Sequence, residues 1–224
     1  MSRGRVLVIG AGGLGCPALF ALAPRVQTVG IVDEDVVELS NLNRQILHRT
    51  EDVGRPKVQS ARDAVRRRFP SASVETLRAR VDADNADAVV RGWDVILDGT
   101  DSFEAKFLIN DACVRAGIPL VHGGVVRFAG QLMSVVPGSA CYRCLFEAPP
   151  PAGVAPSCQE AGIVGAFAGV IGGLMADEAL AILDGKPRWA GTLLVVDGLD
   201  DRRRRVSVRP RPGCEAHSQA REVA

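Results

Sequence analysis

A glycine-rich turn near the N-terminus limits the folds open to this chain more than any other feature. An apolar run at residues 5–9 leads into the sequence GAGGLG at residues 10–15, and a helix-compatible stretch follows. Gly10, Gly12 and Gly15 match the pattern G-x-G-x-x-G, in which missing side chains permit a tight turn, close approach of a phosphate and packing of helix on strand. The turn predicts a nucleotide-binding α/β fold, and it leaves the nucleotide and the reaction open.

An acidic residue follows the second apolar run. The predicted strand at residues 28–32 ends at Asp33, about 20 residues beyond the glycines, where the dinucleotide fingerprint places a carboxylate that accepts from ribose hydroxyls. Beyond it lies a polar segment, DEDVVELSNLNRQ at residues 33–45, which a plain dinucleotide site does not need. The alternative is an ordinary turn, with Asp35 or Ser40 capping the next segment.

The remaining pattern alternates strands with helices. Predicted helices cover residues 56–69, 83–91, 103–116 and 162–183, and predicted strands cover residues 74–78, 94–97, 119–122, 192–196 and 206–209. Two strand-like runs around a glycine at residues 125–136 suggest an antiparallel extension. We therefore expect a Rossmann-like, mostly parallel sheet flanked by helices, with an antiparallel C-terminal extension. A single domain would span residues 1–224, with its nucleotide-binding half at about 1–123 and the extension at about 124–224.

Two aspartates follow the predicted strand at residues 94–97. Ligands of open α/β sheets lie beyond the carboxyl ends of the strands, so Asp98 and Asp101 are expected to face the same crevice as Gly12 and Asp33. One of them is suited to hold Mg²⁺, a cation that takes one or two carboxylates together with phosphate oxygens and water. Asp101 alternatively caps the helix that begins at about residue 103.

The sequence allows two interpretations of Lys57 and two of the arginine runs. Lys57 lies in the first turn of the predicted helix at residues 56–69, where a cation opposes the helix dipole. The residues alone leave two alternatives for Lys57, a functional role and an exposed solubility lysine. The arginine runs at residues 66–68 and 202–205 are expected on solvated faces or a charged strand edge, with a surface for an acidic partner protein as the alternative.

Four ligand-type residues form two distant pairs. They are Cys141 and Cys144, spaced as C-x-x-C, and Cys214 and His217, spaced as C-x-x-H. This set is suited to a closed tetrahedral Zn²⁺ site with a structural role, which would tie the C-terminal tail to the body of the protein. Unrelated thiols and a frayed tail are the alternative.

Composition excludes some classes of function. The formal net charge of +1 gives no indication of nucleic-acid binding. The N-terminus has no apolar segment of the secretory type, so we expect a cytoplasmic protein with thiols or metal-bound cysteines rather than disulfides. The uncharged stretch at residues 162–176 is shorter than the ~20 residues that a membrane span needs, and it predicts a buried helix.

Taken together, these segments resemble the HesA/MoeB/ThiF family, the bacterial relatives of ubiquitin-activating enzymes. The resemblance rests on GAGGLG at 10–15, residues 33–45, GRPK at 54–57, DGTD at 98–101, the first cysteine pair and SCQEAG at 157–162, in this order. It implies a homodimeric, Mg-ATP-dependent enzyme that adenylates the C-terminal Gly-Gly carboxylate of a small ubiquitin-like sulfur carrier protein, for thiamine, molybdopterin or related biosynthesis.

The resemblance also implies residue roles. Asp33 would bind the ribose, Asn41, Arg44 and Lys57 the phosphates, and Asp101 the Mg²⁺, while Cys158 corresponds to a cysteine that becomes covalently linked in some members. The nucleotide-binding set also includes Gly10, Gly12, Gly13, Gly15, Asp35 and Gln45. The chemistry fits this inventory, because the attacking carboxylate needs no general base. The obstacle is the approach of an anion to a polyanion, which cations and Mg²⁺ reduce.

Several features depart from the family pattern. Members usually carry an N-terminal arginine that completes the partner subunit's site, and Arg3 and Arg5 do not match it. His217 stands where a cysteine is usual, and Lys106 where arginine is frequent, which loses bidentate geometry. Without an appended rhodanese domain, sulfur is expected from a separate donor protein.

Other functions stay open at this point. One is a catalytically reduced scaffold or partner subunit of the same fold. Another is adenylation of a different acceptor, a peptide or a modified tRNA base. A third is an NAD-dependent oxidoreductase, because the glycine turn and Asp33 fit it equally well, although Tyr142 has Phe146 rather than a lysine four residues on.

Overall fold

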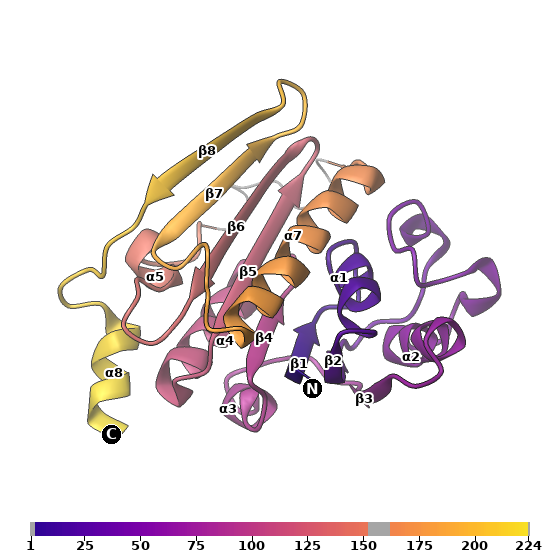
Figure 1. Cartoon of the computed structure of the whole chain (residues 1–224), viewed down its shortest axis with the longest axis horizontal. Coiled ribbons are helices and arrows are strands. Elements are labelled where there is room, and N and C mark those ends of the chain that lie inside the picture. Colours follow the sequence, from indigo (N-terminus) through magenta and orange to yellow (C-terminus); the bar gives the residue numbers. More distant parts are fainter. Residues whose placement is uncertain (1–2, 152–161, 224) are drawn as a thin grey trace.

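The computed structural model describes residues 3–151 and 162–223, which form one eight-stranded sheet with helices on both faces (Figure 1). The elements in chain order are β1 (Arg3–Ile9), α1 (Gly15–Leu22), β2 (Val26–Val32), η1 (Leu39–Asn41), η2 (Thr50–Asp52), α2 (Lys57–Arg68), β3 (Ser73–Leu77), α3 (Ala86–Val90), β4 (Val95–Asp98), α4 (Phe103–Ala116), β5 (Leu120–Val126), β6 (Ala129–Val135), α5 (Tyr142–Leu145), α7 (Gly165–Leu183), β7 (Thr192–Asp197), β8 (Arg202–Ser207) and α8 (Glu215–Val223).

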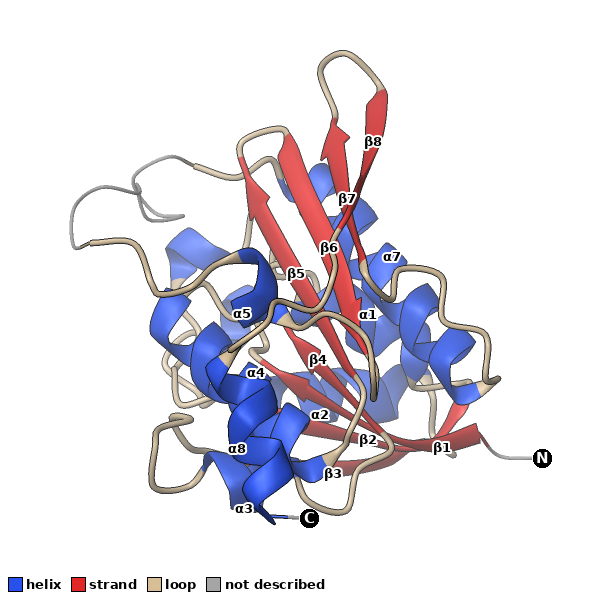
Figure 2. Cartoon of the chain, turned by 90° about the vertical axis from the view of Figure 1, so that its left-hand side faces the viewer, coloured by secondary structure: helices blue, strands red, loops and turns tan. Residues whose placement is uncertain are grey.

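The sheet has a parallel half and an antiparallel half. Its strand order is β3-β2-β1-β4-β5-β6-β7-β8, and neighbours are parallel from β3 to β5. From β5 to β8 they are antiparallel, and Figure 2 shows these strands as two successive hairpins. The mostly parallel sheet with an antiparallel C-terminal extension is confirmed.

Two apolar clusters cover the two faces of the sheet. Val6 and Val8 of β1 belong to the cluster formed with α1, α2 and α7, whereas Leu7 and Ile9 belong to the cluster formed with α3, α4 and α8. A central parallel strand buried on both faces is expected to be apolar throughout rather than alternating, as the run at residues 5–9 is. The glycine turn therefore begins at the end of a strand that is buried on both faces.

The long apolar helix α7 belongs to the core. It is long and apolar enough to cross a membrane, with a mean hydropathy of 1.7, but 56% of it is buried inside the protein. It lies along the sheet beside α1 (Figure 1), which confirms the predicted buried helix. A Cβ atom on Gly172 would lie 2.4 Å from the carbonyl oxygen of Leu14, so this glycine permits the close approach of the two helices.

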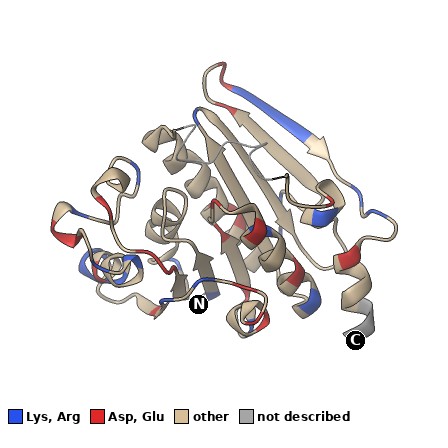
Figure 3. Cartoon of the chain, turned by 180° about the vertical axis from the view of Figure 1, so that it is seen from behind, with Lys and Arg blue, Asp and Glu red and all other residues tan. Residues whose placement is uncertain are grey.

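The antiparallel half differs in detail from the sequence prediction. The turn between β5 and β6 is at Arg127, which adopts a φ of 52°, and not at Gly130. Gly130 serves packing instead, because an added Cβ would lie 2.3 Å from Ile171. The last strand begins at Arg202 rather than residue 206, and its arginines line the sheet edge in Figure 3. Charges suit an edge strand because solvent reaches them there.

Candidate active site

The glycine turn joins β1 to α1 and leaves space for a ligand. A Cβ atom on Gly15 would lie 1.8 Å from the carbonyl oxygen of Gly10, and Gly10 has a φ of 94°, so the backbone requires glycine at both positions. At Gly12 the nearest atom to an added Cβ is 3.8 Å away. Gly12 is therefore not needed for packing, and its surface is available to a phosphate.

Asp33 is bonded to the glycine turn. Its Oδ2 accepts from the backbone N–H of Ala11 at 2.7 Å, and its Oδ1 accepts from the N–H of Asp35 at 2.9 Å. These bonds place the carboxylate at the end of β2 against the turn, where the sequence pattern puts a ribose ligand.

Arg44 and Gln45 also lie at the glycine turn. A Cβ atom on Gly13 would be 3.5 Å from Cγ and Cδ of Arg44, and one on Gly12 would be 3.8 Å from Nε2 of Gln45. The Arg44 guanidinium donates to the Ser40 carbonyl oxygen at 3.1 Å and to Oδ1 of Asn43 at 2.9 Å. The polar segment thus returns to the turn and places a cation beside it.

Asn41 is buried at the start of this return. It is 7% exposed, and its Nδ2 donates to Oγ of Ser40 at 3.3 Å. Its backbone carbonyl oxygen accepts from the N–H groups of Arg44 and Gln45, which closes the local turn. Asn41 therefore fixes the segment that carries Arg44.

Lys57 is a buried cation paired with Asp35. Its side chain is 8% exposed, and Nζ donates to Oδ2 of Asp35 at 2.7 Å. Arg55 supports the preceding loop through ion pairs with Asp52 and Asp63. The interpretation of Lys57 as an exposed solubility lysine is wrong, because burying an ammonium group requires a partner of opposite charge.

The two aspartates after β4 have different environments. Asp98 is fully buried and accepts from Lys106 at 3.1 Å and from His122 at 2.8 Å. Burial alone would raise its pKa, but Lys106 and His122 hold the pKa of this carboxyl well below its usual value. Asp101 is exposed. Of the two candidates for magnesium, only Asp101 is accessible to a bound ion.

The turn that carries Asp101 lies against the glycine turn. The N–H of Gly99 donates to the carbonyl oxygen of Ile9 at 2.9 Å, and a Cβ atom on Gly10 would lie 2.9 Å from the carbonyl oxygen of Gly99. The structure therefore brings Asp33, Arg44 and the Asp101 turn to one place. Lys57 joins them through Asp35.

The sequence analysis did not single out His48, a buried residue that contacts the backbone of the glycine turn. Its Nε2 is 3.1 Å from the carbonyl oxygen of Ala11, and its Nδ1 is 2.8 Å from Oγ of Ser60. Burial lowers the pKa of His48, so the ring is neutral and can donate to one partner and accept from the other. The neighbouring Cys16 is inert, because burial raises the pKa of its thiol to about 12.

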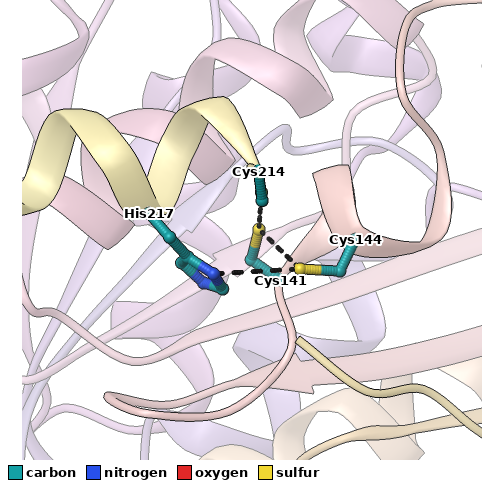
Figure 4. Close-up of side chains that lie close together, drawn as sticks. All are labelled: Cys141, Cys144, Cys214 and His217. Carbon is teal, nitrogen blue, oxygen red and sulfur yellow. Dashed lines mark hydrogen bonds between the residues drawn. The ribbon is translucent and has the colours of Figure 1, made fainter. Parts of the chain in front are cut away.

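The four predicted metal ligands converge on one another (Figure 4). Their ligand atoms all lie within 4.8 Å of one another. Sγ of Cys141 is 3.6 Å from Sγ of Cys214, and Sγ of Cys144 is 3.9 Å from Nδ1 of His217. Three thiols and an imidazole around one point suit a tetrahedral Zn²⁺. Cys141 directly precedes α5 and Cys144 lies in it, while Cys214 directly precedes α8 and His217 lies in it.

Two further residues named in the sequence analysis are Cys158 and Arg5. Cys158 lies outside the described residues. Arg5 does not belong to an arm that reaches away from the domain, because its guanidinium donates to Glu75 at 3.0 Å and stacks on Trp93 at 4.6 Å from the ring centroid.

Comparison with known proteins identifies the family. The model of the ThiF family matches residues 1–216. This chain belongs to the ThiF family. It is 45% identical to the SAMP-activating enzyme E1 of Haloferax volcanii over 94% of this chain and 78% of that protein. It is 44% identical to the sulfur carrier protein adenylyltransferase of Thermus thermophilus over 96% of this chain and 82% of that protein.

Solved structures support the fold. MccB of E. coli in complex with MccA-N7isoASN superposes with a TM-score of 0.86 at 21% identity, covering 96% of this chain and 67% of that chain. MccB with ATP superposes with a TM-score of 0.85 at 20% identity, covering 97% of this chain and 68% of that chain. At this level of identity the likeness concerns the fold.

Proposed function

We propose that this chain is an adenylyltransferase that activates the C-terminal Gly-Gly carboxylate of a ubiquitin-like sulfur carrier protein, forming an acyl-adenylate and pyrophosphate. The observation that carries the proposal is the convergence of Asp33, Arg44 and the Asp101 turn at the glycine turn. The named relatives from Haloferax and Thermus support the reaction and the class of substrate.

The residues divide the reaction between them. Asp33 would bind the ribose hydroxyls, and the N–H groups at the start of α1 would face the phosphates near Gly12. Arg44 and Lys57 would neutralise the phosphates, so that the carrier's carboxylate can approach the α-phosphorus and pyrophosphate can leave. Lys57 would leave Asp35 for the phosphates when the nucleotide binds. The Asp35 carboxylate is exposed, so water can solvate it once the ion pair is broken. Positioning and electrostatic stabilisation supply the rate, and no general base is required.

Two metal ions fit the residues present. Asp101 is the exposed carboxylate for Mg²⁺, which when bound neutralises phosphate charge and assists departure of pyrophosphate. The donor set of Cys141, Cys144, Cys214 and His217 fits Zn²⁺, with a structural role because four protein ligands leave no position for substrate.

A thermal-shift titration tests the nucleotide assignment. Saturating ATP with Mg²⁺ is expected to raise the Tm by about 5 °C or more, and NAD is expected to leave it unchanged. Gly12→Ala should fold normally, because the nearest neighbour of the new methyl group in the described part of the chain is Nε2 of Gln45 at 3.8 Å, but it should lose the ATP shift. Gly15→Ala should instead lower the Tm without ligand, since its methyl group meets the Gly10 carbonyl. A shift with NAD alone would restore the oxidoreductase alternative.

We infer that the enzyme is a homodimer. Phe20 and Ile46 are 40% and 62% exposed, and they line a groove of about 270 Å³ beside α1 and α2. Arg49, Arg67 and Arg68 also line this groove, so its apolar side chains are bordered by charged ones, as is typical of an interaction site. Ile46 is two residues from Arg44, so a second copy that covers the groove would lie close to the site.

Light scattering checks the dimer. The wild type should have the mass of two chains, and Ile46→Asp should have the mass of one. Leu199→Asp is the matched control, because Leu199 is 72% exposed in the β7–β8 turn, and it should remain dimeric. A monomeric wild type would contradict the inference.

Further partners follow from the reaction. A separate protein would donate sulfur to the adenylated carrier, and the reaction would take place in the cytoplasm. A scaffold without catalysis is the second candidate for this fold, and it predicts ATP binding without carrier-dependent exchange of pyrophosphate. The Thermus relative is named for the adenylyltransferase reaction, which favours the enzyme.

A further inference from the structure

A buried polar cluster lies directly behind the turn that carries Asp101. It consists of Asp98 on β4, Lys106 on α4 and His122 on β5, which are 0%, 6% and 3% exposed. Oδ2 of Asp98 accepts from Nζ of Lys106 at 3.1 Å and from Nδ1 of His122 at 2.8 Å. Oδ1 of the same carboxylate accepts from the N–H of Thr100 at 3.0 Å and from its hydroxyl at 2.7 Å. Asp98 therefore joins the cluster to the turn.

Two polar groups of the cluster have unused hydrogen-bonding capacity. Nε2 of His122 is buried and has no hydrogen-bond partner among the described residues. Burial lowers the pKa of His122 against the opposing effect of Asp98, so the ring is neutral, with its proton on Nδ1 and a lone pair on Nε2. The Lys106 ammonium has three N–H groups and donates to Asp98 and to the carbonyl oxygen of Gly123 at 2.8 Å, which leaves one donor without a partner in residues 3–151 and 162–223.

A small cavity borders both Lys106 and His122. It has a volume of about 10 Å³ and is lined by Lys106, His122, Gln131 and Tyr142, together with Gly123, Met133 and Leu193. That volume is about what one water molecule requires, and a buried water needs two to four polar partners. The cavity is too small for a metabolite or a side chain from elsewhere.

We propose that one water molecule occupies this cavity, accepting from Nζ of Lys106 and donating to Nε2 of His122, and that the completed cluster positions the Asp101 turn. The water satisfies the buried imidazole nitrogen, whose desolvation would otherwise cost stability. It also restrains His122 and Lys106, and these two residues restrain Asp98, which bonds to Thr100. The second half of the inference rests on the proposed function, whereas the water site does not.

Replacing Lys106 by arginine tests the water site in a crystal structure. A guanidinium at position 106 reaches farther than an ammonium, so Lys106→Arg should place a nitrogen in the cavity and donate directly to Nε2 of His122. A high-resolution crystal structure of the wild type should show one water within hydrogen-bonding distance of Nζ and Nε2, and the variant should show the guanidinium in its place. A wild-type cavity without density, or one filled by a rearranged side chain, would overturn the water site.

Two substitutions at His122 separate positioning from stability. His122→Asn keeps a donor to Asp98 and loses the water contact, whereas His122→Gln keeps the water contact and loses the donor to Asp98. Because a hydrogen bond to a charged group contributes about 1.5–3 kcal/mol, His122→Gln should raise the half-saturating Mg²⁺ concentration for ATP binding by about tenfold or more. His122→Asn should raise it less.

Calorimetric titration of Mg²⁺-ATP measures this change without catalytic turnover. A merely structural role predicts a lower Tm for both His122 variants with no change in the Mg²⁺ concentration required, and this result would refute the positioning role. If the wild type binds Mg²⁺-ATP but fails to activate any carrier, the proposed reaction is wrong while the water site and the positioning role are still decided by these measurements.

Discussion

Replacement of Arg44 by alanine is expected to slow carrier-dependent exchange of pyrophosphate into ATP by about 100- to 1,000-fold. The Arg44 side chain lies against Gly13, and its guanidinium is bonded only to a backbone carbonyl and to Asn43 in the described part of the chain. These neutral acceptors leave its charge free to act on the phosphates. Without this fixed cation, the negative charge that develops on the phosphates in the transition state would have to be stabilised by water, which must first reorient.

Two matched variants make this prediction specific. Arg44→Lys keeps the charge and loses the planar geometry, so we expect an intermediate rate. Arg91→Ala removes an exposed arginine at the end of α3, and we expect the wild-type rate. Equal rates in Arg44→Ala and Arg91→Ala would remove Arg44 from the catalytic group.

Replacement of Cys214 by serine is expected to lower the affinity for zinc by at least about 100-fold, since even residues that only support metal ligands contribute 10- to 100-fold. Cys214 lies immediately before α8, and its Sγ is 3.6 Å from Sγ of Cys141. Losing this ligand should detach the C-terminal helix from α4, against which it packs. Metal content after dialysis and the rate of limited proteolysis near the C-terminus measure the two effects.

Cys113→Ser is the control for this substitution. Cys113 is fully buried in α4 and is not one of the four clustered ligands. The new hydroxyl should reduce stability by about 1–3 kcal/mol while the zinc content stays that of the wild type. Wild-type zinc content in Cys214→Ser, or no zinc in the wild type, would show that the four side chains do not form a zinc site.

Local patterns in the sequence were sufficient to predict most helices and strands, and also the metal ligands that occur in closely spaced pairs. The spacing of residues in the sequence was enough to identify the glycine turn, Asp33 and the cysteine pairs. The structure brings the four metal ligands together as predicted. The apolar run at residues 5–9 likewise indicated a strand before the turn, and it belongs to β1. These features depend on interactions within a few residues or on side chains with few alternative uses.

Long-range pairings could not be predicted in the same way. Asp98 was one of two candidates for magnesium, but Lys106 and His122, which come from other elements, neutralise it in the core. The pairing of Lys57 with Asp35 and the contact of His48 with Ala11 also depend on how distant segments return to the turn. The arginines at residues 202–205 were expected on a solvated face or a charged strand edge, and they form the edge strand β8, whose position is a property of the whole fold.

Carrier-dependent exchange of labelled pyrophosphate into ATP is the most direct test of the claim that one crevice activates a carboxylate. With a small ubiquitin-like protein ending in Gly-Gly, we predict exchange that requires the carrier, its intact C-terminus and Mg²⁺. Tight binding of ATP with no exchange in the presence of such carriers would contradict the account and would identify the chain as a nucleotide-binding scaffold.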